Sequence, residues 1–176
     1  FFGKKYSWLK KKQIEQAAER AYIALDGYYT NIRAEGEKAV KFADDNNLPI
    51  AVLVGRPYHI DPEINHGIHQ MIGSYNMVVV SEDSVFHLAE APSVRVLNQW
   101  TYHSRMYSAA QYVVNKPNAE LIQLVSFGCG IDAITTDEIR SIIESGNKIY
   151  TQLKIDEINN LGAARIRIRS MLAAVE

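Results

Sequence analysis

Four short apolar runs constrain the fold of this chain more than any other feature. They occupy residues 50–54, 77–80, 121–125 and, more weakly, 148–153. Short runs without polar alternation are typical of strands that are buried on both faces of a sheet. Helical patterns separate the runs at residues 62–72, 100–114 and 136–144, and another follows at 158–174. This alternation predicts a three-layer α/β domain, Rossmann-like or flavodoxin-like, with a mainly parallel four-stranded sheet.

The N-terminal part of the chain has no such runs. Apolar residues at helical spacing predict one helix over residues 8–26 and a second over 32–46, with Asp26-Gly27 between them. We therefore divide the chain into an N-terminal helical segment, residues 1–47, and a parallel α/β domain, residues 48–176. Because the chain opens without a methionine or a signal-peptide layout, we expect it to be a fragment of a larger multidomain protein.

The composition and net charge of the chain argue against two classes of binding partner, nucleic acids and membranes. The 176 residues fit one compact domain, and their formal net charge is -1. Such a balance argues against broad electrostatic attraction to nucleic acid or to an anionic membrane. No apolar run approaches the roughly 20 residues that span a bilayer. A single cysteine excludes an internal disulfide and fits a reducing compartment, so we predict a cytoplasmic protein without nucleic-acid or membrane partners.

The ends of the apolar runs carry the candidate site residues. In open parallel sheets, ligands bind beyond the carboxyl ends of the strands. These ends carry Arg56 and His59 after the first run, Glu82 after the second and Ser126 after the third. Arg56 could hold a phosphate or carboxylate, or form a surface salt bridge. Glu82 could serve acid–base chemistry, or favour the positive end of a helix dipole. No phosphate-loop or dinucleotide-binding glycine pattern is present.

Three histidines lie close together in the sequence, His59, His66 and His69. His66 and His69 are three residues apart on the helix predicted at 62–72, a spacing that places both on one face. A metal site of these side chains is one interpretation, although few further ligands lie nearby. Histidines that are hydrogen-bonded or exposed are the other interpretation.

The only cysteine, Cys129, stands between Gly128 and Gly130 after the third run. A position near a helix N-terminus lowers the pKa of a thiol, and glycines allow the backbone to approach a ligand closely. Both properties fit a reactive or metal-bound sulfur. They fit equally a small buried side chain in a tight turn. One cysteine cannot by itself complete a zinc or iron–sulfur site.

Taken together, five blocks of the sequence resemble the dehydratase-like portion of the acyl-CoA dehydratase activase-related proteins. These multidomain proteins are relatives of the 2-hydroxyacyl-CoA dehydratases, such as 2-hydroxyglutaryl-CoA dehydratase, of anaerobic bacteria. The blocks are Val54-Gly55-Arg56-Pro57-Tyr58-His59, Ile64-Asn65-His66-Gly67-Ile68, Ser81-Glu82-Asp83-Ser84, Ser126-Phe127-Gly128-Cys129-Gly130-Ile131-Asp132-Ala133, and the long C-terminal block from Leu153 to Ser170. The resemblance covers most of residues 50–172.

The resemblance implies a role in an iron–sulfur lyase. Dehydratases of this family hold a [4Fe–4S] cluster on cysteines from separate domains, and an ATP-dependent activase injects one electron into it. The electron passes to an acyl-CoA substrate, which then expels hydroxide. Cys129 would be one iron ligand, Gly128 and Gly130 would give the cluster room and amide donors, and Arg56, His59, Glu82 and Ser126 would line the substrate pocket.

The chain by itself departs from this pattern, because it has one cysteine and no ATP-binding motif. We therefore expect an incomplete site, with no cofactor in the isolated chain and with the other ligands in the remaining domains of the parent protein. Two alternatives stay open. The chain could be a non-catalytic domain that docks the activase or binds an acyl-CoA, or an unrelated flavodoxin-like binding module.

Overall fold

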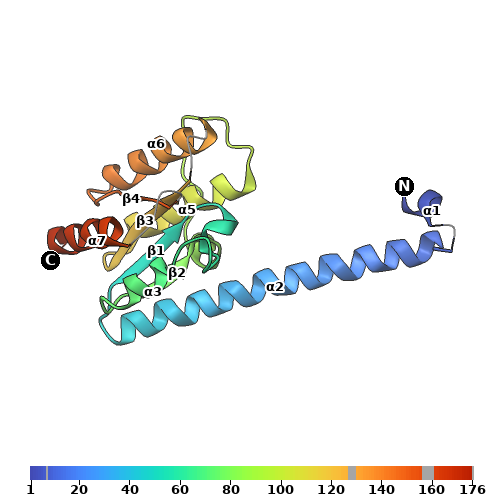
Figure 1. Ribbon diagram of the computed structural model, residues 1–176, viewed down its shortest axis with the longest axis horizontal. Helices are drawn as coiled ribbons and strands as arrows, with labels where there is room; N and C mark the ends of the chain where they lie inside the picture. Colours follow the sequence, from blue (N-terminus) through green and yellow to red (C-terminus); the bar gives the residue numbers. More distant parts are fainter. Residues whose placement is uncertain (7, 127–129, 156–160, 176) are drawn as a thin grey trace.

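The computed structural model describes residues 1–6, 8–126, 130–155 and 161–175. Strands and helices alternate after a long N-terminal helix (Figure 1). In chain order the elements are α1 (Phe2–Lys5), α2 (Lys11–Asp45), β1 (Ile50–Val54), η1 (Pro57–Ile60), α3 (Ile68–Gly73), β2 (Val78–Ser81), α4 (Glu82–Val85), η2 (Phe86–Leu88), α5 (Thr101–Asn115), β3 (Ala119–Val125), α6 (Gly130–Ser145), β4 (Thr151–Lys154) and α7 (Gly162–Val175).

The sheet confirms the predicted α/β fold. Its four strands are all parallel and lie in the order β2-β1-β3-β4. Ile50 of β1 pairs with Val78 of β2 on one side and with Ala119 of β3 on the other. Every residue of the two central strands, β1 and β3, is buried, whereas the edge strands β2 and β4 are partly exposed. This difference explains why the central strands are the clearest apolar runs in the sequence.

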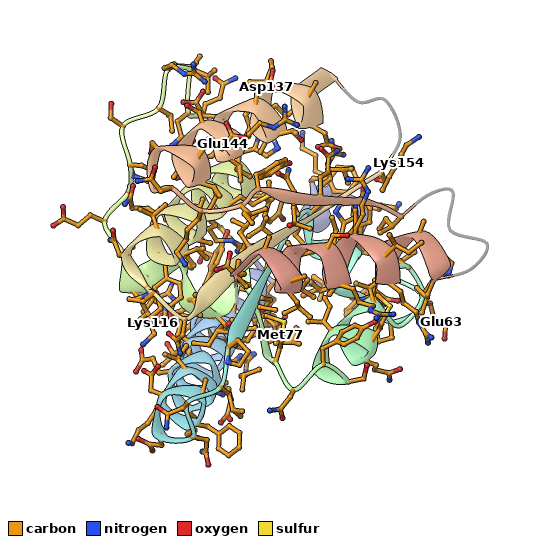
Figure 2. The ribbon with its side chains drawn as sticks, turned by 90° about the vertical axis from the view of Figure 1, so that its left-hand side faces the viewer. Glu63, Met77, Lys116, Asp137, Glu144 and Lys154 are labelled. Carbon is orange, nitrogen blue, oxygen red and sulfur yellow. The ribbon has the colours of Figure 1, made fainter. Side chains whose placement is uncertain are left out.

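Helices cover both faces of the sheet and make a three-layer domain. On one face, alternate residues of β1 pack with α5, α6, α4 and the C-terminal part of α2. The other face packs with α3 and α7. Figure 2 shows side chains filling the space between the strands and the helices of both layers. The two cores follow from the pleat, because successive side chains of a strand point to opposite faces.

The predicted N-terminal helical pair is wrong in one respect, because residues 11–45 form the single helix α2. The break expected at Asp26-Gly27 is absent. A glycine inside a helix costs about 1 kcal/mol relative to alanine, which weakens a helix without ending it. The C-terminal part of α2 packs Ala39, Val40 and Ala43 against the core of the sheet. Its N-terminal part extends away from the domain, as Figure 1 shows.

The predicted helix at 62–72 is also shorter in the structure. The backbone at His66 and Gly67 has φ angles of 53° and 78°, in the left-handed region that a right-handed helix excludes. α3 therefore begins only at Ile68, and the preceding residues form η1 and turns. α6 begins at Gly130 rather than at the predicted residue 136. No helix in the described ranges combines the length and the apolar character needed to cross a membrane.

The exposed part of α2 leads to a prediction about its exchange with solvent. Tyr22 is 73% exposed and Ile23 is 66% exposed, so this part has few tertiary contacts. Most of the stability of helices in proteins comes from tertiary packing, which this part of α2 lacks. In hydrogen exchange measured by mass spectrometry, we expect amides of residues 12–28 to exchange at least 100-fold faster than those of 36–45, since only the latter need the domain to open. Equal protection of the two segments, independent of protein concentration, would contradict this picture.

Candidate functional site

The two central strands meet at a topological switch point. The connection that leaves β1 runs through α3 on one face, and the connection that leaves β3 runs through α6 on the opposite face. The two connections therefore diverge at the carboxyl ends of β1 and β3, where open α/β sheets form a ligand-binding crevice. Residues that follow β1 and β3 come into contact at this place.

An ion pair joins the two sides of the switch point. The Arg56 guanidinium, after β1, donates from Nε and from one terminal nitrogen to Asp132 Oδ1, at 3.0 Å and 2.8 Å. Asp132 lies in the first turn of α6, where the helix dipole favours a carboxylate. The Arg56 side chain is 27% exposed, and that of Asp132 is 11% exposed. The pair carries no net charge, and its more exposed member, the Arg56 guanidinium, is the part that a ligand could approach.

A buried hydrogen-bond chain lies beside this ion pair. The backbone N–H of Arg56 donates to His59 Nδ1 at 3.1 Å, so the neutral ring carries its proton on Nε2. Nε2 lies 3.1 Å from Ser126 Oγ and donates to it, and Ser126 Oγ lies 3.1 Å from the Tyr58 hydroxyl. Because His59 donates to Ser126, it does not act as the base of a serine nucleophile. The histidine instead holds Ser126 in place.

Burial sets the charge state of His59. It lowers the pKa of His59, and the positive charge of Arg56 acts in the same direction, while Asp132 opposes it. The ring is therefore neutral at pH 7. Gly55 makes this packing possible, because a Cβ at that position would lie 2.6 Å from His59 Nδ1 and 3.0 Å from the Leu124 carbonyl oxygen. The glycine after β1 is thus required by the close approach of the histidine.

A pocket of about 560 Å³ opens next to these groups. We call it the switch-point pocket, and it is lined by Arg56, Pro57, Tyr58, Trp100, Tyr102, His103 and Ile131. Its volume is in the range of small-molecule sites, and aromatic walls with a few polar groups are typical of them. A smaller pocket of about 270 Å³ shares Trp100, His103 and Ile131 with it. The arrangement can bind a ligand that combines a flat apolar part with a negative charge.

His103 contributes a second neutral imidazole to this pocket. It is 8% exposed and lies in α5, with its ring 5.9 Å from that of Trp100. Burial lowers the pKa of His103; Asp132 raises it and Arg56 lowers it further. No local pattern marked His103 in the sequence. Its position in the first turn of α5 was the available signal. A helix that connects two parallel strands begins near the carboxyl end of the first strand, which is the edge of the sheet where ligands bind.

The structure brings together three of the predicted site residues, Arg56, His59 and Ser126. Glu82 is buried at the start of α4 and pairs with Arg105 at 2.9 Å, and it does not line the switch-point pocket. Gly130 is the first residue of α6, beside the pocket residue Ile131. Gly128 and Cys129 lie outside the described residues.

The three-histidine interpretation finds no support in the described part of the chain. His59 contacts Ser126, and His69 Nδ1 lies 3.1 Å from Asn65 Oδ1. His66 lies in a turn before α3. Within the described ranges, no group of three or more His, Cys, Asp or Glu side chains is arranged to hold a metal ion.

The strand order and the flanking helices define a flavodoxin-like α/β domain, with a pocket at its switch point. Residues 2–85 match the family described as the CoA enzyme activase uncharacterised domain (DUF2229). The matched region runs from α1 through α4 and includes Arg56, His59 and Glu82. The match supports a relation to the CoA enzyme activase-related proteins. No curated protein and no solved structure matches the chain.

Proposed function

We propose that this chain is one domain of an iron–sulfur 2-hydroxyacyl-CoA dehydratase or activase-related protein. In this proposal, Cys129 supplies one ligand of a [4Fe–4S] cluster, and the switch-point pocket forms part of the binding site for an acyl-CoA. The reaction is the ATP-driven, one-electron reductive dehydration of that substrate. The match to a CoA enzyme activase family supports the class, and the resemblance of residues 126–133 to a cluster-ligand loop supports the role of the cysteine.

One observation carries the proposal: on both sides of residues 127–129, the described chain lies at or next to the switch-point pocket. Ser126 directly follows β3, and its Oγ lies 3.1 Å from the hydroxyl of the pocket residue Tyr58. On the other side of the loop, Gly130 leads directly to Ile131 of the pocket wall. A ligand held between Ser126 and Gly130 would therefore lie near Arg56 and the aromatic walls.

The donor set of the chain fits one ligand of a shared cluster and does not fit a complete cluster. Iron–sulfur clusters of this type are held by several cysteine thiolates, and the sequence has one cysteine. The remaining ligands and the ATP-dependent activase thus belong to other domains or partners in this proposal. When bound, the cluster supplies a single electron. The described residues bind and orient: Arg56 pairs with a negative group of the substrate, and Trp100 and Tyr102 exclude water from one side of it.

We expect the isolated chain to hold no stable cluster after anaerobic reconstitution with iron and sulfide, because one thiolate cannot anchor it. In the longer polypeptide that contains this chain, Cys129→Ser should remove most of the iron and the visible absorption. The thermal midpoint of the variant should stay close to that of the unchanged protein, which separates loss of a ligand from loss of the fold. About four irons per monomer in the isolated chain, or unchanged iron in the Cys129→Ser polypeptide, would overturn the cluster role.

A second candidate function is a non-catalytic domain that binds an acyl-CoA. The switch-point pocket favours this function. Its aromatic walls and the Arg56 guanidinium could bind an acyl-CoA, and binding alone requires no catalytic group of the chain. The same experiment distinguishes the two candidates. Unchanged iron in the Cys129→Ser polypeptide, together with acyl-CoA binding by the isolated chain, would support this second function.

A further inference from the structure

A second pocket lies away from the switch point, between α2 and α5. Its volume is about 530 Å³, and it shares no lining residue with the switch-point pocket. We call it the arginine pocket. Its polar wall comes from three elements: Arg33 of α2, His87 of η2, and Arg105 of α5. Tyr29, Phe86, Ala89 and Ala91 provide its apolar wall.

The polar wall contains buried nitrogens without partners. Within the described ranges, Arg33 Nε, Arg105 Nε and His87 Nδ1 are buried and have no hydrogen-bond partner. Arg105 is only 8% exposed, so water does not readily replace the missing partner. Leaving a buried polar group unpaired costs about 1–3 kcal/mol, and more for a charged group. Three such groups at one pocket point to an acceptor that satisfies them together.

The charges at this pocket are also unbalanced. The guanidinium carbons of Arg33 and Arg105 lie 5.2 Å and 6.0 Å from the centre of the Phe86 ring. Arg105 pairs with Glu82, whereas Arg33 forms no ion pair with any described residue. His87 Nε2 lies 2.8 Å from Glu37 Oε1, which leaves Nδ1 directed elsewhere. Arg33 therefore brings a positive charge to the pocket without an ion-pair partner among the described residues, and a bound anion would balance it.

The geometry of the donors distinguishes a phosphate from a carboxylate. A carboxylate offers two oxygens, whereas the donors here converge from three separate elements. Thr101 and Ser104, in the first turn of the 15-residue helix α5, also line the pocket, and each has a hydroxyl that can donate a hydrogen bond. A phosphate group has three terminal oxygens and suits arginine forks and a helix start. The remaining volume and the apolar wall require an organic part beside the phosphate.

We propose that the arginine pocket binds an organic phosphate, with the phosphate group held by Arg33 and Arg105 and the organic part against Phe86 and Tyr29. This site is separate from the proposed cluster and acyl-CoA site, so its test does not depend on that function. Glu82 is compatible with it, because burial raises the pKa of Glu82 to about 7 and weakens its hold on the Arg105 charge.

The test is isothermal titration calorimetry of the chain with inorganic phosphate and pyrophosphate at constant ionic strength, which keeps charge screening equal. We expect saturable binding, and at least tenfold weaker binding by Arg33→Met, the loss expected from removing a charged hydrogen bond. Methionine retains packing on Phe86. The matched control is Arg20→Met, which removes the same charge from an exposed position of the same helix. No saturable binding, or equal loss in both variants, would overturn the proposal.

A second pair of variants leaves every donor in place. Ala91→Asp puts a negative charge at the exposed mouth of the arginine pocket, whereas Ala174→Asp puts the same charge on α7. We expect the first variant to weaken phosphate binding severalfold by repulsion and the second to leave it unchanged. Succinate at the same ionic strength should bind at least tenfold more weakly than phosphate. Equal affinity for succinate would overturn the assignment to phosphate.

Discussion

Replacing Gly36 with alanine is expected to lower the free energy of unfolding by about 1–3 kcal/mol, the usual cost of inserting a methyl group into a packed contact. Gly36 lies in α2 where this helix crosses α4. A Cβ at this position would lie 2.3 Å from the backbone oxygen of Ser84 and 2.7 Å from its Cβ. Backbone atoms cannot rotate away, so the two helices would have to separate.

The matched control for this substitution is Gly27→Ala in the same helix. A Cβ at Gly27 has no atom within 4 Å, so the added methyl group meets only solvent. Alanine is about 1 kcal/mol more favourable than glycine inside a helix, and the control should therefore increase helicity without loss of stability. Urea denaturation followed by circular dichroism measures both. A Gly36→Ala protein as stable as the Gly27→Ala protein would show that α2 and α4 do not cross as described.

The second large effect is a pH dependence that comes from Glu82. Burial raises the pKa of Glu82 from 4.5 to about 7; the negative charge of Asp83 adds to the rise, and Arg105 opposes it. Between these values the folded state holds a proton that the unfolded state has released. The contribution of Glu82 to stability is therefore complete below about pH 4.5 and is lost as the pH rises through 7. A rise of this size corresponds to about 3 kcal/mol.

Comparison with Glu82→Gln isolates this contribution, because glutamine has a similar shape and does not titrate. We expect the unfolding free energy of the unchanged protein to fall relative to that of the variant by about 3 kcal/mol between pH 4.5 and 8. The lowered pKa values of His59 and His103 act in the opposite direction, but they are common to both proteins and cancel in the difference.

The control for the Glu82 experiment is Glu144→Gln, which removes a carboxylate from the exposed side of α6 (Figure 2). Its difference from the unchanged protein should stay within about 0.5 kcal/mol at every pH, as for most surface substitutions. A Glu82→Gln difference that is equally flat would mean that Glu82 ionises in the folded protein as readily as in the unfolded chain.

The central strands show how much of the fold could be predicted from sequence. The run at 50–54 coincides with β1, and the run at 121–125 lies within β3. Strands buried on both faces leave an uninterrupted apolar run, which is a local signal. The glycines of α2 show the opposite case. The sequence at Gly27 suggests a helix end that the structure does not have, whereas nothing in the sequence marks Gly36, which lies against Ser84 of α4.

Some residues of the candidate site could likewise be predicted from the sequence, and others could not. Arg56, His59 and Ser126 were predicted because they lie in the segments that follow strands, and a parallel sheet brings such segments to one edge. His103 was not predicted, and neither were the residues of the arginine pocket, which come from α2, η2, α5 and the segment between η2 and α5. Their convergence depends on how α2, η2 and α5 pack, and helix packing leaves no pattern in any single segment.

Local sequence patterns are sufficient to predict a parallel α/β domain with polar residues at its strand ends. Local periodicity and residue type carry that information, because burial on one or both faces acts on each segment separately. Three features depend on the tertiary structure: α2 is one continuous helix whose C-terminal part packs on the sheet, Glu82 pairs with Arg105 away from the switch-point pocket, and the Nε atoms of Arg33 and Arg105 at a second pocket are buried without hydrogen-bond partners. These features depend on contacts between residues far apart in the chain, which are set by the crossovers and the packing of helices.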